Sequence, residues 1–372
     1  MTGSPLRVVV VAPLRFPIRQ PHAGGLESAV WNEVRTLRAR GHEVSLVAVR
    51  GSDFLDGGPA EFALPTLDWP AGARATDSHY PDAYLERSVP ALDRALDVIA
   101  RDPARYDVIS NHCLHGLPLR RAADLGVPMV STLHTPLEPE LVDAAAHARG
   151  TRFLAVSAHT RREWAPVVDA TVLPNGIDAV DWPAGPGGDG LVWSGRLVPE
   201  KAPHLAIEAA RLLGRELTIA GRIGDREYAE RHVLPHVGDG VRYVGLLDQP
   251  ALARLIGRSA CALGTPAWEE PFGLVGPEAL MCGTPVAAFG AGGIREIART
   301  ATGMSAVPRG DVSALADAAG RLATRAAAEP GFRVAVRASA RRHYGLDTRV
   351  DALERVFRAL VAQRGTGAEL IA

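Results

Sequence analysis

The sequence predicts an α/β protein made of two doubly wound domains, each a parallel sheet covered by helices. Short apolar runs rich in β-branched residues alternate with helical patterns through both halves of the chain. The densest cluster of proline and glycine, Trp182–Gly190, separates the two halves. With 372 residues, 47% of them apolar, the chain is long enough to bury ordinary hydrophobic cores in both.

The composition narrows the class of partner. The formal net charge is −1, from 41 Lys and Arg against 42 Asp and Glu, so we expect neither a nucleic-acid groove nor a polybasic membrane patch. The three cysteines form no CxxC pair, which is typical of free thiols in the cytoplasm. The first apolar run, Val8–Ala12, ends at Pro13 and is too short for a signal peptide or a membrane span. We therefore expect a cytoplasmic protein with no transmembrane segment, and peripheral membrane contact stays open.

The first domain is expected at residues 1–181 and begins with a strand, a glycine loop and a helix. Leu6–Ala12 is a continuous β-branched run, Leu26–Arg40 has helical spacing, and Val44–Val49 is the next strand. The loop ends in Gly24 and Gly25, where a doubly wound fold tolerates a phosphate. A tight turn with no ligand explains the two glycines equally well.

Predicted strands and helices continue to alternate through the rest of this domain. The further elements expected are a long surface excursion at Gly51–Ser78, helices at Ala83–Ala100 and up to Leu125, and strands at Tyr106–Ser110, Pro128–Leu133, Arg152–Ser157 and Ala170–Leu173.

Histidines follow two of these strands. Because open parallel sheets bind ligands beyond the carboxyl ends of their strands, His134, directly after the strand that ends at Leu133, is expected at a ligand site. His112 and His115 follow the strand that ends at Ser110. The alternative is a buried, hydrogen-bonded structural histidine. For His112 and His115 this alternative explains the sequence as well as a ligand site does. Their HxxH spacing does not indicate a metal site, because no third ligand accompanies it.

The second domain is expected at residues 190–345 and repeats the alternation. The expected elements are strands at Leu191–Ser194, Glu216–Ala220, Val241–Val244 and Ala260–Gly264, helices at Pro203–Leu213 and Gly276–Cys282, and a helical, Ala-rich region from Asp311 onward. The segment Gly290–Ile294, GAGGI, lacks the context of a dinucleotide fingerprint, which follows the first strand of a βαβ unit. A last amphipathic helix is expected within residues 346–372.

Two cations flank the turn after the first strand of the second domain. Arg196 and Lys201 stand five positions apart, and Lys201 is the only lysine of the chain. An arginine fork and a compact ammonium together neutralise a diphosphate and stabilise charge on a leaving group. The alternative is a pair of exposed cations near a helix start.

The stretch from Trp268 to Pro285, WEEPFGLVGPEALMCGTP, carries the strongest functional pattern. Glu270 precedes a short helix and Glu278 lies within it, while Gly273 allows the backbone to approach a ligand. The first N–H groups of a helix have no internal acceptor and favour an anion. Two carboxylates beside such a site suit a polyol, because each accepts hydrogen bonds from neighbouring hydroxyl groups. The alternative is a surface helix with two solvated acids.

Together, Glu270 with the following Pro-Phe-Gly, Glu278 eight positions after Glu270, and CGTPV at positions 282–286 resemble the signature of retaining glycosyltransferases of family 4. The resemblance covers both halves. It implies the GT-B fold, in which two Rossmann-like domains face each other across a cleft, and a C-terminal helix that crosses back to the first domain.

The resemblance also implies roles for the candidate residues. Glu270 and His134 are expected beside the reacting sugar, as the catalytic pair. The expected diphosphate site consists of Gly24, Gly25, Arg196, Lys201, Gly273 and Leu274. The donor sugar and ribose are expected at Phe272 and Glu278, and the acceptor at His112 and His115.

The implied reaction is transfer of a hexose, with retention, from a nucleotide-diphosphate sugar to an acceptor hydroxyl. No Asp-x-Asp occurs in the chain, so we expect no metal and no cofactor beyond the sugar nucleotide, with UDP favoured as its nucleotide. The expected acceptor is a small molecule, a lipid or a glycan. Two alternatives remain: another GT-B chemistry, such as that of an epimerase or phosphorylase, and a non-catalytic nucleotide-sugar-binding protein.

Overall fold

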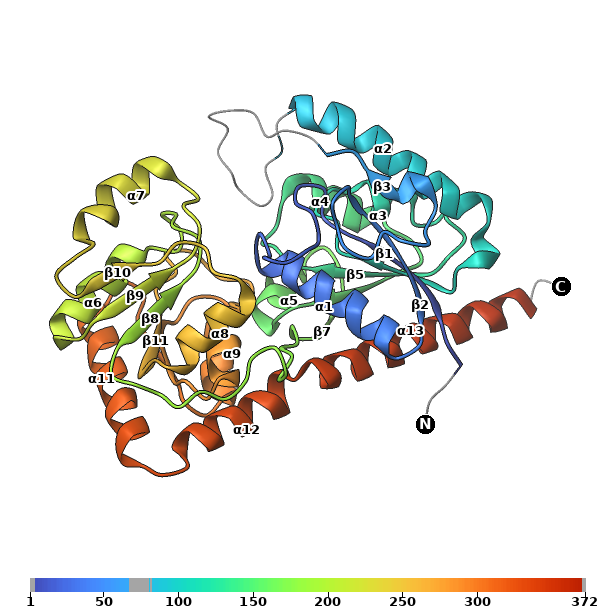
Figure 1. Cartoon of the computed structure of the whole chain (residues 1–372). Helices are drawn as coiled ribbons and strands as arrows, with labels where there is room; N and C mark the ends of the chain where they lie inside the picture. Colours follow the sequence, from blue (N-terminus) through green and yellow to red (C-terminus); the bar gives the residue numbers. More distant parts are fainter. Residues whose placement is uncertain (1–3, 67–79, 81, 370–372) are drawn as a thin grey trace. The chain divides into compact units, whose positions relative to one another are not determined.

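The computed structural model describes residues 4–66, 80 and 82–369, and it divides the chain into two compact units (Figure 1). The N-terminal unit comprises the chain up to Pro174 together with the segment from Arg349 onward. The C-terminal unit comprises Asn175–Thr348. The chain therefore passes between the units twice.

The N-terminal unit is built on a parallel sheet of seven strands in the order β3-β2-β1-β4-β5-β6-β7. Its strands are β1 (Arg7–Val11), β2 (Glu43–Val49), β3 (Ala63–Leu64), β4 (Val108–Asn111), β5 (Met129–Leu133), β6 (Thr151–Ala155) and β7 (Ala170–Val172). Val10 pairs with Leu46 on one side and with Ser110 on the other. Strands buried on both faces read as continuous apolar runs, which is why β1 and β2 are recognisable in the sequence.

Helices cover this sheet. They are α1 (Gly25–Ala39), α2 (Asp82–Arg101), α3 (Leu117–Arg121), α4 (Pro139–His147), α5 (Ala158–Trp164) and the part of α13 (Leu346–Glu369) that begins at Arg349. One core cluster joins β1 and β4 to α2, α3 and α4 through fully buried side chains such as Val9, Leu92 and Ile109. The apolar face predicted for α1 faces the core, because Val30, Val34 and Leu37 have no exposed surface.

The expectation of a long surface excursion at Gly51–Ser78 is wrong in part. Ala60–Phe62 form a short 3-10 helix, and Ala63–Leu64 form the edge strand β3, which pairs in parallel with Ala48 and Val49 of β2. A strand of two residues has no readable alternation, so its formation depends on the neighbouring strand. Residues 67–79 of this stretch lie outside the described residues.

The C-terminal unit repeats the architecture with a parallel sheet of six strands in the order β10-β9-β8-β11-β12-β13. Its strands are β8 (Leu191–Ser194), β9 (Leu217–Ala220), β10 (Val241–Tyr243), β11 (Cys261–Gly264), β12 (Val286–Phe289) and β13 (Met304–Val307). Two strands of this sheet were not predicted: β12, whose short sequence VAAF is half alanine, and the edge strand β13, whose half-exposed sequence MSAV lacks a β-branched run. The predicted class of two doubly wound α/β domains is confirmed.

Helices lie on both faces of this second sheet (Figure 1). They are α6 (Pro203–Leu213), α7 (Arg226–His232), α8 (Gln249–Gly257), α9 (Val275–Met281), α10 (Ile294–Thr300), α11 (Val312–Ala328) and α12 (Phe332–Tyr344). The Pro- and Gly-rich segment at Trp182–Gly190 lies within this unit. The amide of Gly185 donates to the carbonyl of Cys282, and Arg337 donates to the carbonyl of Trp182 at 2.5 Å.

Each sheet has one point where the strand order reverses direction. In the N-terminal unit this point lies between β1 and β4, and in the C-terminal unit between β8 and β11. The loops that leave neighbouring strands here diverge to opposite faces of the sheet and open a crevice at the carboxyl ends, where open α/β sheets bind ligands. The loops after these four strands carry most of the candidate residues.

Candidate functional site

The reversal point of the C-terminal unit brings Lys201 and Glu270 together. Lys201 lies in the loop after β8, and Glu270 lies in the loop after β11. The Nζ of Lys201 donates to both carboxylate oxygens of Glu270, at 2.8 and 2.6 Å. The two side chains keep 24% and 13% of their surface exposed, so the pair is open to a ligand. Sequence patterns placed both residues at the site but did not predict that they form an ion pair.

Two tryptophans and Thr265 hold this pair in place. The indole Nε1 of Trp268 donates to Glu270 at 2.9 Å, and the Lys201 ammonium lies 5.3 Å from the centre of the Trp268 ring. The hydroxyl of Thr265 donates to the Lys201 carbonyl and accepts a hydrogen bond from Trp193, both at 2.9 Å. Trp268 therefore restricts the rotation of both side chains before a ligand binds, and Thr265 fixes the backbone at Lys201.

Arg196 lies at the same end of β8. Its guanidinium is 3.8 Å from the Glu200 carboxylate, and only 14% of its side chain is exposed. The glycines that follow β8 and β9 let the two loops touch, because a side chain on Gly221 would collide with the backbone of Gly195. The Gly221 amide in turn donates to the carbonyl of Gly245, at 2.8 Å. Backbone contacts therefore connect the loops that follow β8, β9 and β10.

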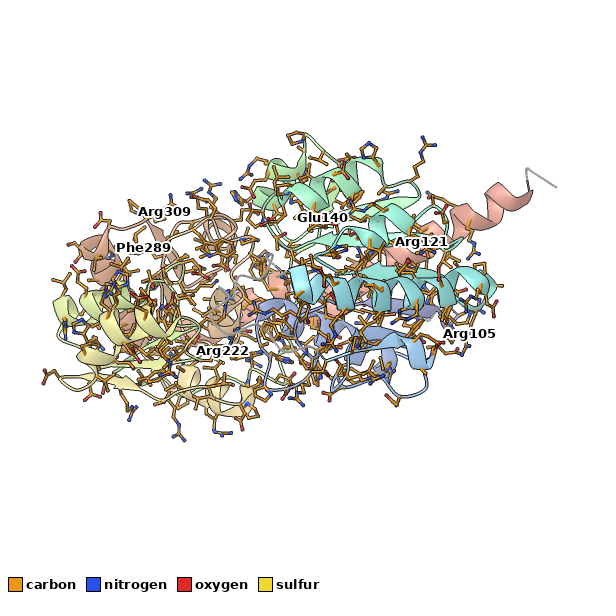
Figure 2. The ribbon with its side chains drawn as sticks, turned by 90° about the horizontal axis from the view of Figure 1, so that it is seen from above. Arg105, Arg121, Glu140, Arg222, Phe289 and Arg309 are labelled. Atoms are coloured by element: carbon orange, nitrogen blue, oxygen red, sulfur yellow. The ribbon has the colours of Figure 1, made fainter. Side chains whose placement is uncertain are left out.

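The loop at residues 268–274 is supported by the GAGGI segment at 290–294. The amide of Gly293 donates to the Glu270 carbonyl at 2.8 Å, and the amide of Gly292 donates to the Glu269 carboxylate at 2.6 Å. Arg309, labelled in Figure 2, also pairs with Glu269, at 3.2 Å. Gly292 and Gly293 of the GAGGI segment therefore hold the loop that carries Glu270 through their backbone amides.

Gly273 and Phe272 connect this loop to α9. Gly273 has φ +88, a left-handed conformation that favours glycine, and a Cβ there would lie 3.0 Å from Ile294. The Phe272 ring is buried and packs edge-on against Tyr344, with ring centres 5.9 Å apart. A sugar can therefore reach only the main chain of Phe272. Leu274 is the N-cap residue of α9, which begins at Val275.

Glu278 lies in the first turns of α9. Its side chain makes no hydrogen bond or ion pair with any residue that the structure describes, although part of its surface remains exposed. Burial by the surrounding protein disfavours the charged form and raises the pKa of Glu278 to about 7. An unpaired carboxylate of this kind gains from any ligand that donates hydroxyl hydrogens to it.

The remaining candidates lie in the N-terminal unit. Gly24 and Gly25 begin α1, and Gly24 has extended dihedrals without a side-chain cap. His115 lies 3.5 Å from Glu140, which is labelled in Figure 2 and accepts hydrogen bonds from Arg120 and from the Gly116 amide. Burial is the main cause that lowers the pKa of His115, ahead of the opposing charge of Glu140.

His134 and His112 are in direct contact at the carboxyl ends of β5 and β4. His112 Nδ1 lies 2.9 Å from His134 Nε2. The His112 side chain has no exposed surface, whereas His134 remains partly exposed. A side chain with no exposed surface cannot touch an acceptor, so the expectation that His112 binds the acceptor does not fit this geometry.

Glu33, which was not among the predicted site residues, contacts His112. Its Oε1 is 3.1 Å from His112 Nε2 and accepts a hydrogen bond from Ser110 at 2.6 Å. Burial acts to raise the pKa of Glu33, but its contacts with His112, Arg349 and Ser110 lower it to about 2. A signal was available: Glu33 lies three positions after Val30 and four before Leu37, on the apolar face of α1, where a carboxylate needs a partner.

Within residues 4–66, 80 and 82–369, no three His, Cys, Asp or Glu side chains are grouped so that they could hold a metal ion. Over the same part of the chain, every helix is either too short or too polar to cross a bilayer.

Family models match both units. The model of Glycosyltransferase Family 4 matches residues 23–180, and the model of Glycosyl transferases group 1 matches residues 188–325. Together the two matches span well over half of the chain.

Individual proteins agree with these matches. The glycogen synthase of Mycobacterium tuberculosis is 39% identical over 166 residues, which span 41% of this chain and 39% of that protein. The D-inositol 3-phosphate glycosyltransferase of Mycolicibacterium paratuberculosis is 29% identical and covers 98% of this chain and 94% of its own length. Anabaena HepE, solved in complex with UDP and glucose, has the same fold, with a TM-score of 0.70 at 18% identity, over 95% of this chain and 99% of that chain.

Proposed function

Because the chain belongs to the GT-B glycosyltransferases of family 4, we propose that it transfers a hexose, with retention, from a nucleotide-diphosphate sugar to an acceptor hydroxyl. The observation that carries this proposal is the Lys201–Glu270 pair, which lies at the reversal point of the C-terminal sheet with part of both side chains exposed. A cation for a phosphate and a carboxylate for sugar hydroxyls thus stand within one hydrogen bond of each other.

The ion pair leaves capacity for a ligand on both sides. An ammonium has three hydrogens and the two carboxylate contacts use two of them, so one remains for a phosphate oxygen. A carboxylate has about four acceptor positions, and Lys201 and Trp268 occupy three of them. We propose that Lys201 and Arg196 neutralise the diphosphate and that Glu270 accepts a hydrogen bond from a hydroxyl of the hexose.

The chemical step needs charge stabilisation on the leaving group. The bond between the anomeric carbon and the diphosphate oxygen breaks, and the acceptor oxygen bonds to that carbon on the same face. The acceptor proton passes to the departing phosphate. Developing negative charge on the diphosphate is stabilised by the two fixed cations, and such preorganised stabilisation is usually the largest catalytic contribution. With cations supplied by side chains, no divalent ion is needed in this scheme.

Glu278 and the N-terminal unit supply the remaining roles in the proposal. Glu278 accepts hydrogen bonds from the ribose hydroxyls, which compensates for its lack of protein partners. His134 contacts the hexose, Gly24 and Gly25 let the donor diphosphate approach the backbone, and the acceptor binds at the loops after the strands of the N-terminal unit, beside His115. The complex of Anabaena HepE with UDP favours UDP as the nucleotide, and the named relatives act on a glycan and on a polyol phosphate, which favours a hydroxyl-rich acceptor.

A thermal-shift panel of sugar nucleotides, followed by transfer assays with the best ligand, tests this proposal. A ligand at a hundred times its Kd stabilises the folded protein by about 2.7 kcal/mol, enough to shift the melting temperature by several degrees. Lys201→Ala should then weaken UDP binding at least about tenfold, as expected when a charge-assisted hydrogen bond is lost.

The matched control is Arg226→Ala, which removes a cation that is 83% exposed on α7 of the same unit. This variant should bind UDP like the wild type. Equal UDP affinity of Lys201→Ala and the wild type by calorimetry would reject the diphosphate site. A panel in which no sugar nucleotide raises the melting temperature would reject the function itself.

A further inference from the structure

A continuous chain of polar side chains runs from the interior of the N-terminal unit to the partly exposed His134. Arg349 of α13 lies 3.7 Å from Glu33 of α1, Glu33 contacts His112, and His112 contacts His134. All but His134 have side chains no more than 5% exposed. Arg349 is held in turn by the carbonyls of Leu173 and Pro174, at 2.9 and 2.8 Å.

The chemistry of Glu33 sets the direction of the first hydrogen bond. The pKa of Glu33 is held near 2, so its carboxylate is ionised and can only accept hydrogens. The hydrogen between Glu33 and His112 therefore belongs to His112 Nε2. The hydroxyl of Ser110 donates to the same carboxylate oxygen, so it does not supply a competing hydrogen to His112.

Charge balance sets the direction of the second hydrogen bond. The charges of Glu33 and Arg349 cancel, and a second positive charge on His112 would be buried without a counter-ion. His112 is therefore neutral, with its hydrogen on Nε2 and a lone pair on Nδ1. His134 Nε2, 2.9 Å away, must then carry the hydrogen that they share.

The directions of these two hydrogen bonds determine the state of Nδ1, the other ring nitrogen of His134. With its hydrogen on Nε2, neutral His134 has a lone pair on Nδ1, and no residue that the structure describes hydrogen-bonds to that atom. Burial lowers the pKa of His134 well below its usual value, and the positive charge of Arg349 acts in the same direction, so the ring stays neutral at physiological pH.

We propose that Glu33 and His112 are positioning residues that fix His134 as the Nε2–H tautomer and present its Nδ1 as an acceptor for a substrate hydroxyl. The identity of the hydroxyl-bearing substrate rests on the proposed function, whereas the tautomer does not. The carboxylate acts through two imidazoles, and neither Glu33 nor His112 touches the substrate. If His134 also populated the other tautomer, some molecules would present an Nδ1–H donor to the hydroxyl. Holding one tautomer keeps Nδ1 an acceptor in every molecule.

Nitrogen-15 spectra of the histidine rings test the proposal without any activity measurement. In the wild type, His134 should show a protonated Nε2 and an unprotonated Nδ1. In Glu33→Gln the amide both donates and accepts, so it also permits the reversed direction of both hydrogen bonds, and His134 should populate both tautomers. A wild-type His134 with its hydrogen on Nδ1, or an unchanged single tautomer in Glu33→Gln, overturns the proposal.

Kinetics supply the second readout. Glu33→Gln should lower kcat by about tenfold to a hundredfold, the range for a misplaced hydrogen-bonding or proton-transfer group, while UDP affinity stays unchanged. The matched control is His42→Gln. His42 is also a buried histidine, held by the Leu6 amide at 2.9 Å and by Glu354 at 3.0 Å, but it has no link to His134. His42→Gln should keep the wild-type kcat. An equal loss of kcat in both variants would show that the loss comes from general destabilisation.

Loss of Glu33 alone leaves Arg349 without its counter-ion, so we expect a low yield of this variant unless the charge is balanced. Glu33→Gln combined with Arg349→Gln leaves no unpaired charge and should give the same mixed tautomers. If no sugar nucleotide supports transfer at all, the proposed function fails, but the spectra still decide the tautomer. If transfer proceeds and the His134 tautomer is insensitive to residue 33, only the positioning proposal fails.

Discussion

Glu270 is held by a lysine 69 positions earlier in the chain and by a tryptophan two positions before it. We expect Glu270→Gln to lower the transfer rate at least about a hundredfold, because it removes a charge that is oriented before the sugar binds. The amide keeps the size of the side chain, so the fold should persist. Initial rates at saturating sugar nucleotide, with melting curves for both proteins, measure the effect.

Glu227→Gln is the control for this substitution. It removes an acid that is 78% exposed and pairs with Arg231 of the same helix. Its rate should equal that of the wild type. If Glu270→Gln also transfers at the wild-type rate, Glu270 has no part in the mechanism.

Glu278 gives the protein a pH dependence whose sign follows from its raised pKa. Between about pH 4.5 and 7 the folded state keeps a proton that the unfolded state has released, so the free energy of unfolding falls as pH rises through this window. From pH 5 to pH 8, the wild type should lose on the order of 2 kcal/mol relative to Glu278→Gln. Denaturant unfolding of both proteins at several pH values measures this difference.

The comparison isolates one group, because all other titrations are common to the two proteins. A difference that stays constant with pH would mean that Glu278 titrates at its usual value. Since the ionised carboxylate is the better acceptor for ribose hydroxyls, the wild type should also bind UDP more tightly above pH 7 than below it. Glu278→Gln should not show that increase.

The candidate residues differ in how far the sequence could identify them. Glu270, Gly273 and Glu278 belong to one contiguous segment, so their spacing carries the pattern. The partners that orient the candidates come from elsewhere: Lys201 for Glu270, and Glu33 for His112, 79 positions apart. No local pattern encodes such a pairing, because it depends on which loops and helices meet at the sheet.

The α10 segment supports the loop that carries Glu270 through close backbone packing. A Cβ on Gly293 would lie 2.6 Å from the Pro271 carbonyl oxygen and 3.0 Å from the Phe272 Cα. Gly293→Ala should therefore push the loop away, cost about 1–3 kcal/mol of stability and lower kcat by more than about tenfold. Denaturant unfolding and steady-state kinetics measure the two effects.

Gly190→Ala provides the comparison. It lies before β8 in the same unit, and an added Cβ would meet only the Glu216 carbonyl oxygen at an ordinary 3.6 Å. Stability and kcat should both stay close to the wild type. Wild-type behaviour of Gly293→Ala would show that the contact between the two loops does not position Glu270.

Elements were predictable where their pattern is long or bounded by strong signals. The helix Pro203–Leu213 was predicted with its bounds unchanged, because a proline opens it and Gly214 closes it in a left-handed conformation. The edge strands β3 and β13 were missed. Both are short and contain at most two β-branched or large apolar residues, so their strand character depends on the pairing with β2 and β12.

Two distant parts of the chain make up the N-terminal unit, and α13 supplies the second of them. Val350, Leu353 and Phe357 of this helix are almost completely buried. A chain that ends at Thr348 loses their burial, about 2 kcal/mol for each side chain, and leaves Glu33 without Arg349. Since a domain is stable by only about 5–15 kcal/mol, the N-terminal unit should unfold while the C-terminal unit stays folded.

Hydrogen exchange followed by mass spectrometry measures this for each unit separately. Peptides from β1, β4 and β5 should lose protection, and peptides from β8, β11 and β12 should keep it. Truncation after Arg364 is the control, since it retains all three apolar side chains and Arg349. Equal protection of both units in the chain that ends at Thr348 would show that α13 is dispensable for the N-terminal fold.

Read alone, the sequence establishes the class of the protein, its alternating strands and helices, and the segment with Glu270 and Glu278, because each of these is encoded in neighbouring residues. Folding establishes the rest: the Lys201–Glu270 ion pair, the chain from Arg349 to His134, and the assignment of α13 to the N-terminal unit. These features join residues tens to hundreds of positions apart. Their energies come from burial and charge pairing between segments, and such terms exist only once the sheets have brought those segments together.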